Sequence, residues 1–222
     1  MQQIPLEFAF ISSKGREDFL VSDANSTAVS WLDKWPNWPA PFLLITGPKG
    51  CGKTHLSHIW ADKTAAKTLQ ANDLDRLTIE ELAEVAKSCV VLEDVDEATN
   101  EPNFFHLYNL IKENGQFLLI TSQLIIDEWD IQLPDLRSRM ATVQVARIEE
   151  PDDMLFGAIL LKLFSDRQLQ VTPEVIQYLL TRLERTFKAA LSTVEELDSL
   201  SLSEKRRITI PLVRDLLNGM NS

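Results

Sequence analysis

The stretch GPKGCGKTHL, residues 47–56, decides the fold of this chain of 222 residues. Gly47, Gly52, Lys53 and Thr54 match the pattern G-x-x-x-x-G-K-T of a loop that holds phosphate groups. Glycines let successive backbone N–H groups converge on one point, and the following helix adds its positive end. Lys53 would then reach the β- and γ-phosphates, and the Thr54 hydroxyl would hold Mg²⁺. The stretch therefore predicts a nucleotide-binding site.

The sequence on either side of the loop supplies the context that this motif requires. The run FLLIT before it is short and continuously apolar, as expected of a strand buried on both faces. After it, Leu56, Ile59 and Trp60 recur at helical spacing. The alternative, a glycine turn before a helix with an exposed lysine, is weakened by this strand–loop–helix order.

Strand and helix patterns continue to alternate along the first two thirds of the chain. A helix with Asp23 or Asn25 as its cap precedes the first strand. Further strands are predicted at 66–70, 90–97, 116–122 and 141–147, and helices at 78–88, 103–115 and 133–140. Alternating β and α units indicate an α/β fold with a parallel sheet between helices.

From about residue 150 the strand patterns stop and only helical patterns follow. We therefore predict an N-terminal peptide and linker over 1–18, a nucleotide-binding α/β domain over 19–149, and a helical domain over 150–222. The helical part has roughly seventy residues, a size within the range of an independent core.

Composition sets the broad class of protein. No apolar run approaches the ~20 residues of a membrane helix, and the opening residues do not resemble a secretory signal. The two cysteines, Cys51 and Cys89, do not suggest a disulfide framework, so a reduced cytoplasmic protein is expected. A formal net charge of −11 makes duplex DNA a less favoured partner.

Polar residues follow two of the predicted strands. Glu93 and Asp94 end the run VVLED, and ligands of open α/β sheets bind at this edge. One carboxylate is needed near Mg²⁺, and another can orient an attacking water. Ser122 ends the next strand, where its hydroxyl could sense a γ-phosphate. Solvated acids at a strand end are the alternative interpretation.

The ordered motifs GKTHL, VVLEDVD, FFHLYNLI, ITS and LPDLRSRM resemble the AAA+ core of the bacterial replication initiator DnaA. The segment from Arg182, RLERTFKAALSTVEELDSLSLSEKRRITIPLVRDLL, resembles the lid of the Hda family, shorter relatives that inactivate DnaA. The resemblance covers nearly the whole chain. It implies a five-stranded parallel sheet, a helical lid, and ADP or ATP with Mg²⁺ in the crevice between them. The helix-turn-helix domain of DnaA has no counterpart here, so no sequence-specific DNA binding is expected.

The resemblance also implies roles for individual residues. FLVSDAN, from Phe19, resembles the segment that packs near adenine. The implied nucleotide-binding set is Leu20, Val21, Gly47, Gly50, Cys51, Gly52, Lys53, Thr54, His55, Ser122 and Lys188. Thr54 and Glu93 form the implied metal set, and Asp94 is a catalytic carboxylate. Arg139 matches an arginine finger, which stabilises charge on the phosphoryl group of a neighbouring molecule. Without the resemblance, Arg139 would be taken as part of a basic helix face.

Two residues depart from the family pattern. Lys188 stands where the lid normally carries a sensor arginine, and a lysine lacks the planar fork of a guanidinium. Glu93 replaces the usual first aspartate of the strand-end pair, and its extra methylene changes its reach to a metal. Both departures favour weak intrinsic hydrolysis and a nucleotide that is held rather than consumed.

The N-terminal peptide QQIPLEF resembles the clamp-binding motif of the Hda family through Gln3, Ile4, Leu6 and Phe8. In an extended segment, Ile4, Leu6 and Phe8 point to one side and can enter one hydrophobic pocket. The implied partner is the DNA polymerase sliding clamp. The alternative is a terminus that packs on its own domain or on nothing.

The resemblance as a whole implies negative control of replication initiation, in which the chain promotes ATP hydrolysis by DnaA. Association of the chain with copies of itself is a further possibility that the resemblance allows. Three alternatives remain at this stage: a helicase-loader type of AAA+ adaptor, a small-molecule phosphotransferase, and a nucleotide-stabilised scaffold with an unused finger.

Overall fold

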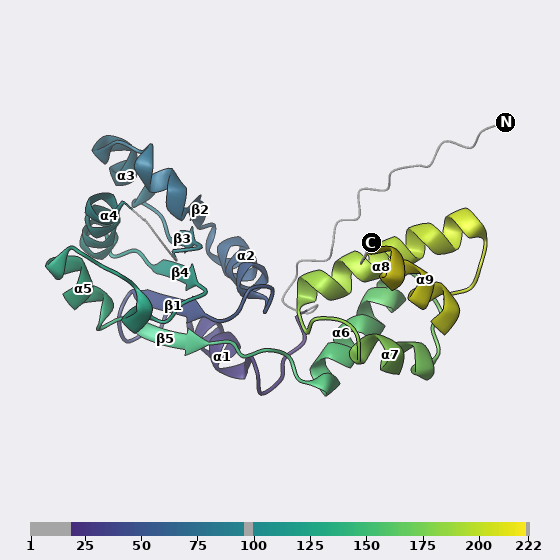
Figure 1. Ribbon diagram of the computed structural model, residues 1–222. Helices are drawn as coiled ribbons and strands as arrows, with labels where there is room; N and C mark the ends of the chain where they lie inside the picture. Colours follow the sequence, from purple (N-terminus) through teal and green to yellow (C-terminus); the bar gives the residue numbers. More distant parts are fainter. Residues whose placement is uncertain (1–18, 96–99, 221–222) are drawn as a thin grey trace.

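A computed structural model describes residues 19–95 and 100–220 of the protein, in an α/β lobe and a helical lobe (Figure 1). The α/β lobe holds all five described strands, and the helical lobe begins after the last of them. Within the described residues, no helix has the length and apolar character needed to span a membrane.

Five parallel strands form the sheet of the α/β lobe. They are β1 (Phe42–Thr46), β2 (Lys67–Gln70), β3 (Val90–Glu93), β4 (Leu118–Ser122) and β5 (Gln144–Arg147). Their order is β2-β3-β4-β1-β5, and every pairing is parallel. Strand β1 lies between β4 and β5, with Thr46 beside Ser122 and Arg147. The carboxyl ends of β1 and β4 therefore meet at one edge, as the sequence predicts.

Helices cover both faces of the sheet, which explains its continuously apolar strands. Phe42 and Leu44 belong to a core with helices α3 (Ile79–Val85), α4 (Glu101–Glu113) and α5 (Pro134–Met140). Leu43 and Ile45 belong to a second core with α1 (Ser26–Lys34) and α2 (Lys53–Thr64). Alternate residues of one strand point to opposite faces, so both sets must be apolar. Short 3₁₀ turns at Ala71–Asp75 and Ile126–Glu128 complete this lobe.

Local signals explain several helix ends. Thr78 caps α3 by accepting from the N–H of Glu81 at 3.2 Å, and Asn100 caps α4 in the same way. Of the two predicted caps of α1, Asn25 and not Asp23 occupies the N-cap position, but its side chain makes no capping hydrogen bond to the helix. Its side chain accepts from the N–H of Ser22 and donates to the carbonyl of Leu20 instead. The Asn25 side chain therefore orders the segment that enters the helix.

The helical lobe consists of α6 (Asp153–Asp166), α7 (Pro173–Leu180), α8 (Phe187–Glu204) and α9 (Ile210–Met220). These helices share a core of their own, in which Phe156 and Phe164 are fully buried. Asp152 caps α6 and Thr186 caps α8 through their side-chain oxygens. The domain limits at residues 149 and 150 remain a prediction, although they fall between the end of β5 and the start of α6.

Candidate nucleotide-binding site

The phosphate loop connects β1 to α2 and packs closely against its surroundings. A Cβ atom on Gly47 would lie 2.3 Å from the carbonyl oxygen of Ile148, so a side chain is excluded there. Gly50 has φ +78°, and a Cβ atom on it would lie 2.8 Å from the Cβ of Thr186. The loop therefore needs glycine for reasons of space as well as conformation.

The Lys53 side chain is bound inside the loop. Its Nζ donates to the carbonyl oxygens of Gly47 at 2.7 Å and Pro48 at 3.0 Å, and the residue is only 6% exposed. The ammonium group thus lies at the centre of the loop, beside the N-terminal end of α2. Backbone N–H groups, a helix N-terminus and one cation form a donor set that fits a phosphate group.

The oxygen donors expected for Mg²⁺ lie in unequal environments. Thr54 is exposed in the first turn of α2, whereas Glu93 is 3% exposed at the end of β3. The Glu93 carboxylate accepts from the Ser57 hydroxyl at one oxygen and from Gln70 Nε2, 2.9 Å away, at the other. Hydroxyl and carboxylate oxygens suit Mg²⁺ chemically, but Glu93 would have to exchange these bonds to reach one. Its metal role remains a prediction.

The two other strand-end residues are also held locally. Asp94 is exposed, has φ +57°, and donates its backbone N–H to Thr121 Oγ1 at 3.1 Å. Ser122 is fully buried, and its hydroxyl donates to the carbonyl of Leu124 while accepting from Trp129 Nε1 at 3.1 Å. Asp94 therefore presents a carboxylate at the sheet edge, whereas the Ser122 hydroxyl is engaged in binding the following loop. The predicted roles, orientation of water by Asp94 and sensing of the γ-phosphate by Ser122, both remain predictions.

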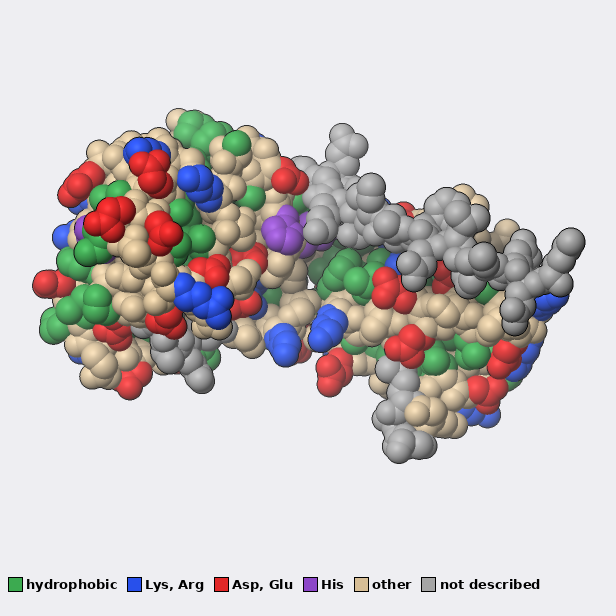
Figure 2. All heavy atoms as spheres, turned by 90° about the horizontal axis from the view of Figure 1, so that it is seen from above, with side chains coloured by type: hydrophobic (Ala, Val, Ile, Leu, Met, Phe, Trp, Pro, Cys, Tyr) green, Lys and Arg blue, Asp and Glu red, His purple; other side chains and the backbone are tan. Residues whose placement is uncertain are grey.

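A cavity of about 480 Å³ lies between the phosphate loop, the N-terminal segment and the lid. Figure 2 shows the indentation between the two lobes. The residues that line the cavity are Phe19, Leu20, Ala24, Asn25, Gly50, Cys51, Gly52, His55, Ile148, Glu149, Pro151, Leu155, Ile159, Lys162, Leu163, Asp166, Arg167, Phe187, Leu191 and Glu195. A mainly apolar cavity beside a phosphate-binding loop has the size and chemistry that a nucleotide base and ribose require.

The lid contacts the phosphate loop directly at this cavity. The N–H of Phe187 donates to the carbonyl oxygen of Gly50 at 2.9 Å. The ring of His55 lies edge-on to Phe19, with centroids 5.3 Å apart, and edge-on to Phe187, at 6.2 Å. These rings come from the N-terminal segment, from α2 and from α8, so one aromatic row joins both lobes beside the loop.

Several predicted nucleotide-binding residues therefore come together, and others do not. Leu20, Gly50, Cys51, Gly52 and His55 all line the cavity. Residues outside its lining are Val21, Gly47, Lys53, Thr54, Ser122 and Lys188. The Lys188 side chain is exposed, one residue beyond Phe187.

The lid side of the cavity contains residues that the sequence analysis missed. Leu155, Ile159 and Leu163 recur every four residues along α6 and face the cavity. Arg167 pairs with Glu195 at 2.9 Å, and Lys162 pairs with Asp166 at 3.3 Å, so the same wall is charged. The four-residue spacing was a visible signal, but it equally describes a helix packing on its own core.

Cys51 contributes a thiol to the cavity lining. Burial raises the pKa of its thiol, while the nearby Lys53 ammonium partly lowers it. The thiol therefore stays protonated at neutral pH and behaves mainly as a small apolar side chain.

Arg139 lies elsewhere, on the last turn of α5 and outside the cavity lining. Helix α5 is on the side of the α/β lobe away from the lid (Figure 1). The predicted clamp-binding residues, Gln3, Ile4, Leu6 and Phe8, lie outside the described residues.

Comparisons with known proteins agree on the lid and on the fold. The family described as "Hda, lid domain" matches residues 158–217. An uncharacterised protein of Haemophilus influenzae is 28% identical over 236 residues, covering 98% of this chain and 99% of its own length.

Solved structures with the same fold include DnaA and RuvB. Domain III of DnaA from Thermotoga maritima aligns with a TM-score of 0.77 and 20% identity, over 94% of this chain and 97% of that one. AMPPCP-bound DnaA from Aquifex aeolicus aligns with a TM-score of 0.70 and 23% identity, over 82% of this chain. This chain spans 64% of the length of that protein. A variant of RuvB from Thermotoga maritima aligns with a TM-score of 0.74 and 19% identity, over 94% of this chain and 72% of that one.

The five-stranded parallel sheet, the phosphate loop between β1 and α2, and the helical lid are those of an AAA+ fold, as the resemblance implies. The match of residues 158–217 to the Hda lid domain is more specific than the similarity of the fold. The chain thus shares the fold of these DnaA and RuvB structures, and its residues 158–217 are similar to the Hda lid domain.

Proposed function

We propose that this chain is a nucleotide-controlled regulator that binds ADP or ATP with Mg²⁺ and promotes ATP hydrolysis by the replication initiator DnaA. The observation that carries the proposal is the bond between Phe187 N–H and the Gly50 carbonyl beside an apolar cavity. A phosphate group in the loop and a base in the cavity would contact both lobes at once. Bound nucleotide would therefore fix the angle between the lobes.

Each residue of the crevice has a distinct task in this proposal. Lys53 binds the phosphates, and Thr54, with Glu93, would hold Mg²⁺, which neutralises phosphate charge when bound. Leu20 and Val21 would lie near the base, and His55 lies in the aromatic row with Phe19 and Phe187. Lys188 directly follows Phe187, the lid residue that contacts the loop. Asp94 orients water, and the departures at Glu93 and Lys188 make the chain's own hydrolysis slow.

The proposed finger, Arg139, acts on a different molecule. Its place on α5, on the side of the lobe away from the lid, suits donation to a neighbour's nucleotide (Figure 1). A guanidinium brought to a transferring phosphoryl group stabilises the charge that develops there. The nucleotide in this chain would then set its shape, and hydrolysis would occur on DnaA.

The proposed partner that brings the chain to replicating DNA is the sliding clamp. This part of the proposal rests on the sequence of the first eight residues, with Gln3 and the apolar anchors Ile4, Leu6 and Phe8. Pro5 would restrict the free peptide and so lower the entropy cost of docking.

A reconstituted assay with DnaA, DNA-loaded clamp and this protein tests the proposal. Arg139→Ala should abolish stimulated hydrolysis and keep clamp binding, whereas deletion of residues 1–8 should abolish both. Arg182→Ala is the matched control, because that arginine also lies over a tyrosine ring, 3.8 Å from the centroid of Tyr178, but on the lid. Full activity of both test variants would refute the mechanism.

Two other outcomes would favour the alternative functions. Binding to a replicative helicase and not to the clamp would favour a helicase-loader function. Substrate-dependent ADP formation without any protein partner would favour a phosphotransferase.

A further inference from the structure

Arg139 is held by two aromatic rings of its own chain. Its guanidinium carbon lies 5.1 Å from the ring centroid of Phe105 and 5.4 Å from that of Tyr108. We propose that Phe105 and Tyr108 form an aromatic seat that positions Arg139 before a neighbouring nucleotide arrives. This inference rests on the proposed function, because it concerns how the finger is presented.

The seat follows from helix geometry. Phe105 and Tyr108 are three residues apart on α4, so their side chains lie next to each other on one helix face. Helix α5 packs against α4 through Leu136 and Met140, which belong to the same core. Arg139, between these two residues in sequence, is thereby brought over the rings.

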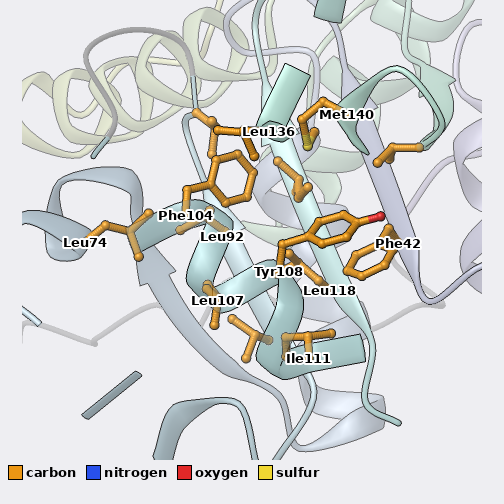
Figure 3. Close-up of a cluster of buried hydrophobic side chains, with 14 of the residues drawn as sticks. Phe42, Leu74, Leu92, Phe104, Leu107, Tyr108, Ile111, Leu118, Leu136 and Met140 are labelled. Carbon is orange, nitrogen blue, oxygen red and sulfur yellow. The ribbon is translucent and has the colours of Figure 1, made fainter. Parts of the chain in front are cut away.

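Tyr108 makes the seat rigid. Its ring is stacked on that of Phe42 (Figure 3). The ring centroids are 3.7 Å apart and the planes are 9° from parallel. Tyr108 is 5% exposed, and burial raises the pKa of its hydroxyl, so the ring remains neutral. The support for Arg139 therefore extends through Tyr108 to the first residue of β1.

The two arginines of α5 have different kinds of partner. Arg137 Nε donates to the carbonyl oxygen of Ile131 at 3.0 Å, so its guanidinium is bound to the backbone. Arg139 is held by neutral rings, which attract a cation through their quadrupole. A cation held by rings keeps its full charge for an incoming anion, whereas a carboxylate partner would compete with that anion. This difference favours Arg139 over Arg137 as the contributed group.

The aromatic seat should affect the saturating rate of stimulated ATP hydrolysis and not the affinity for DnaA. Removing one cation–π contact of about 0.5–1 kcal/mol corresponds to about a 2- to 5-fold change in the equilibrium constant between the seated and the unseated arginine. Phe105→Leu keeps apolar volume without a ring, so we expect the saturating rate of stimulated hydrolysis to fall, by at most about 5-fold. The concentration for half-maximal stimulation should stay unchanged. Phe105→Trp, which restores a ring, should restore the rate.

Two controls separate positioning from a general structural effect. Tyr108→Phe retains the ring and should behave as wild type. In an Arg139→Ala background, Phe105→Leu should have no further effect, because no guanidinium remains to be positioned. Equal nucleotide affinity of wild type and Phe105→Leu, measured by calorimetry, shows that the crevice is intact.

A partner-independent readout keeps the inference distinct from the proposed function. Side-chain Nε–Hε relaxation by NMR should report an ordered Arg139 in wild type and Phe105→Trp, and a more mobile one in Phe105→Leu. Equal order in all three proteins would overturn the seat, whatever DnaA does. A faster stimulated rate in Phe105→Leu would also overturn it, since the rings would then be withholding the arginine. Failure of the wild-type protein to stimulate DnaA, with the NMR difference present, would refute the proposed function and leave the seat established as a structural device.

Discussion

The N–H of Phe187 and the carbonyl oxygen of Gly50 are joined by a hydrogen bond of 2.9 Å, which ties the first residue of α8 to the phosphate loop. Thr186, which caps α8, lies against the same glycine. The loop and the lid thus share a backbone contact as well as a cavity. A change in the loop conformation must therefore alter the seating of the lid helix.

Gly50→Ala should weaken adenine nucleotide binding about tenfold or more. The new methyl group would meet Thr186, and the positive φ adds strain of about 1–2 kcal/mol. Isothermal calorimetry measures the affinity, and thermal unfolding checks the fold. Gly219→Ala is the control, since that exposed glycine of α9 has open space around it and helix propensity favours alanine. Unchanged affinity in Gly50→Ala would show that the lid contact is dispensable.

Lys53→Ala should lower nucleotide affinity about 10- to 100-fold, because a charge-assisted hydrogen bond contributes roughly 1.5–3 kcal/mol. Lys49→Ala provides a comparison within the same loop, since Lys49 is exposed while Lys53 is buried at the loop centre. The Lys49 variant should bind nucleotide nearly as wild type. Equal losses in both variants would indicate a general charge effect instead of a specific phosphate contact.

Ser57→Ala should reduce the free energy of unfolding by about 1–3 kcal/mol in the absence of nucleotide. The change removes one of the two donors to the buried Glu93 carboxylate and leaves an oxygen unsatisfied. Urea unfolding gives the value. Ser203→Ala, on the exposed surface of α8, should change stability by less than about 0.5 kcal/mol. A neutral Ser57 variant would mean that Glu93 finds another partner.

Labelling of Cys51 with a thiol reagent should be slow at neutral pH and should accelerate as the pH rises. The raised pKa of this thiol keeps the thiolate fraction low, and only the thiolate reacts. Bound nucleotide should slow the reaction further, because Cys51 lines the cavity. A Cys51→Ser variant isolates the contribution of the buried Cys89. Labelling of Cys51 that is indifferent to nucleotide would place the nucleotide elsewhere.

The order of strands and helices along the chain could be predicted from the sequence, because the signals for each element lie within that element. FLLIT and the glycine pattern predict β1, the loop and α2, and all three lie where predicted. The edge position of β5 agrees with its alternating pattern. Asn25, one of the two predicted caps, is the N-cap residue of α1, but its side chain bonds to Ser22 and Leu20 instead of to the helix.

Side-chain contacts between segments that are distant in the sequence could not be predicted from sequence patterns. Nothing in residues 90–94 indicates that Glu93 would be held by Ser57 and Gln70, because both partners come from other elements. The rings beneath Arg139 are a similar case: FFHLYNLI predicts a helix but not which of its faces meets α5. Such pairings depend on how elements pack, and helical periodicity leaves that open.

Strand β1 begins at Phe42, beneath the tyrosine that supports the arginine, and ends at Thr46, where the phosphate loop starts. Five residues of extended chain cover only about 16 Å, and hydrogen-bonded neighbours flank this strand on both sides. The strand is thus an inextensible spacer between the site that would accept a nucleotide and the group that would be lent to another.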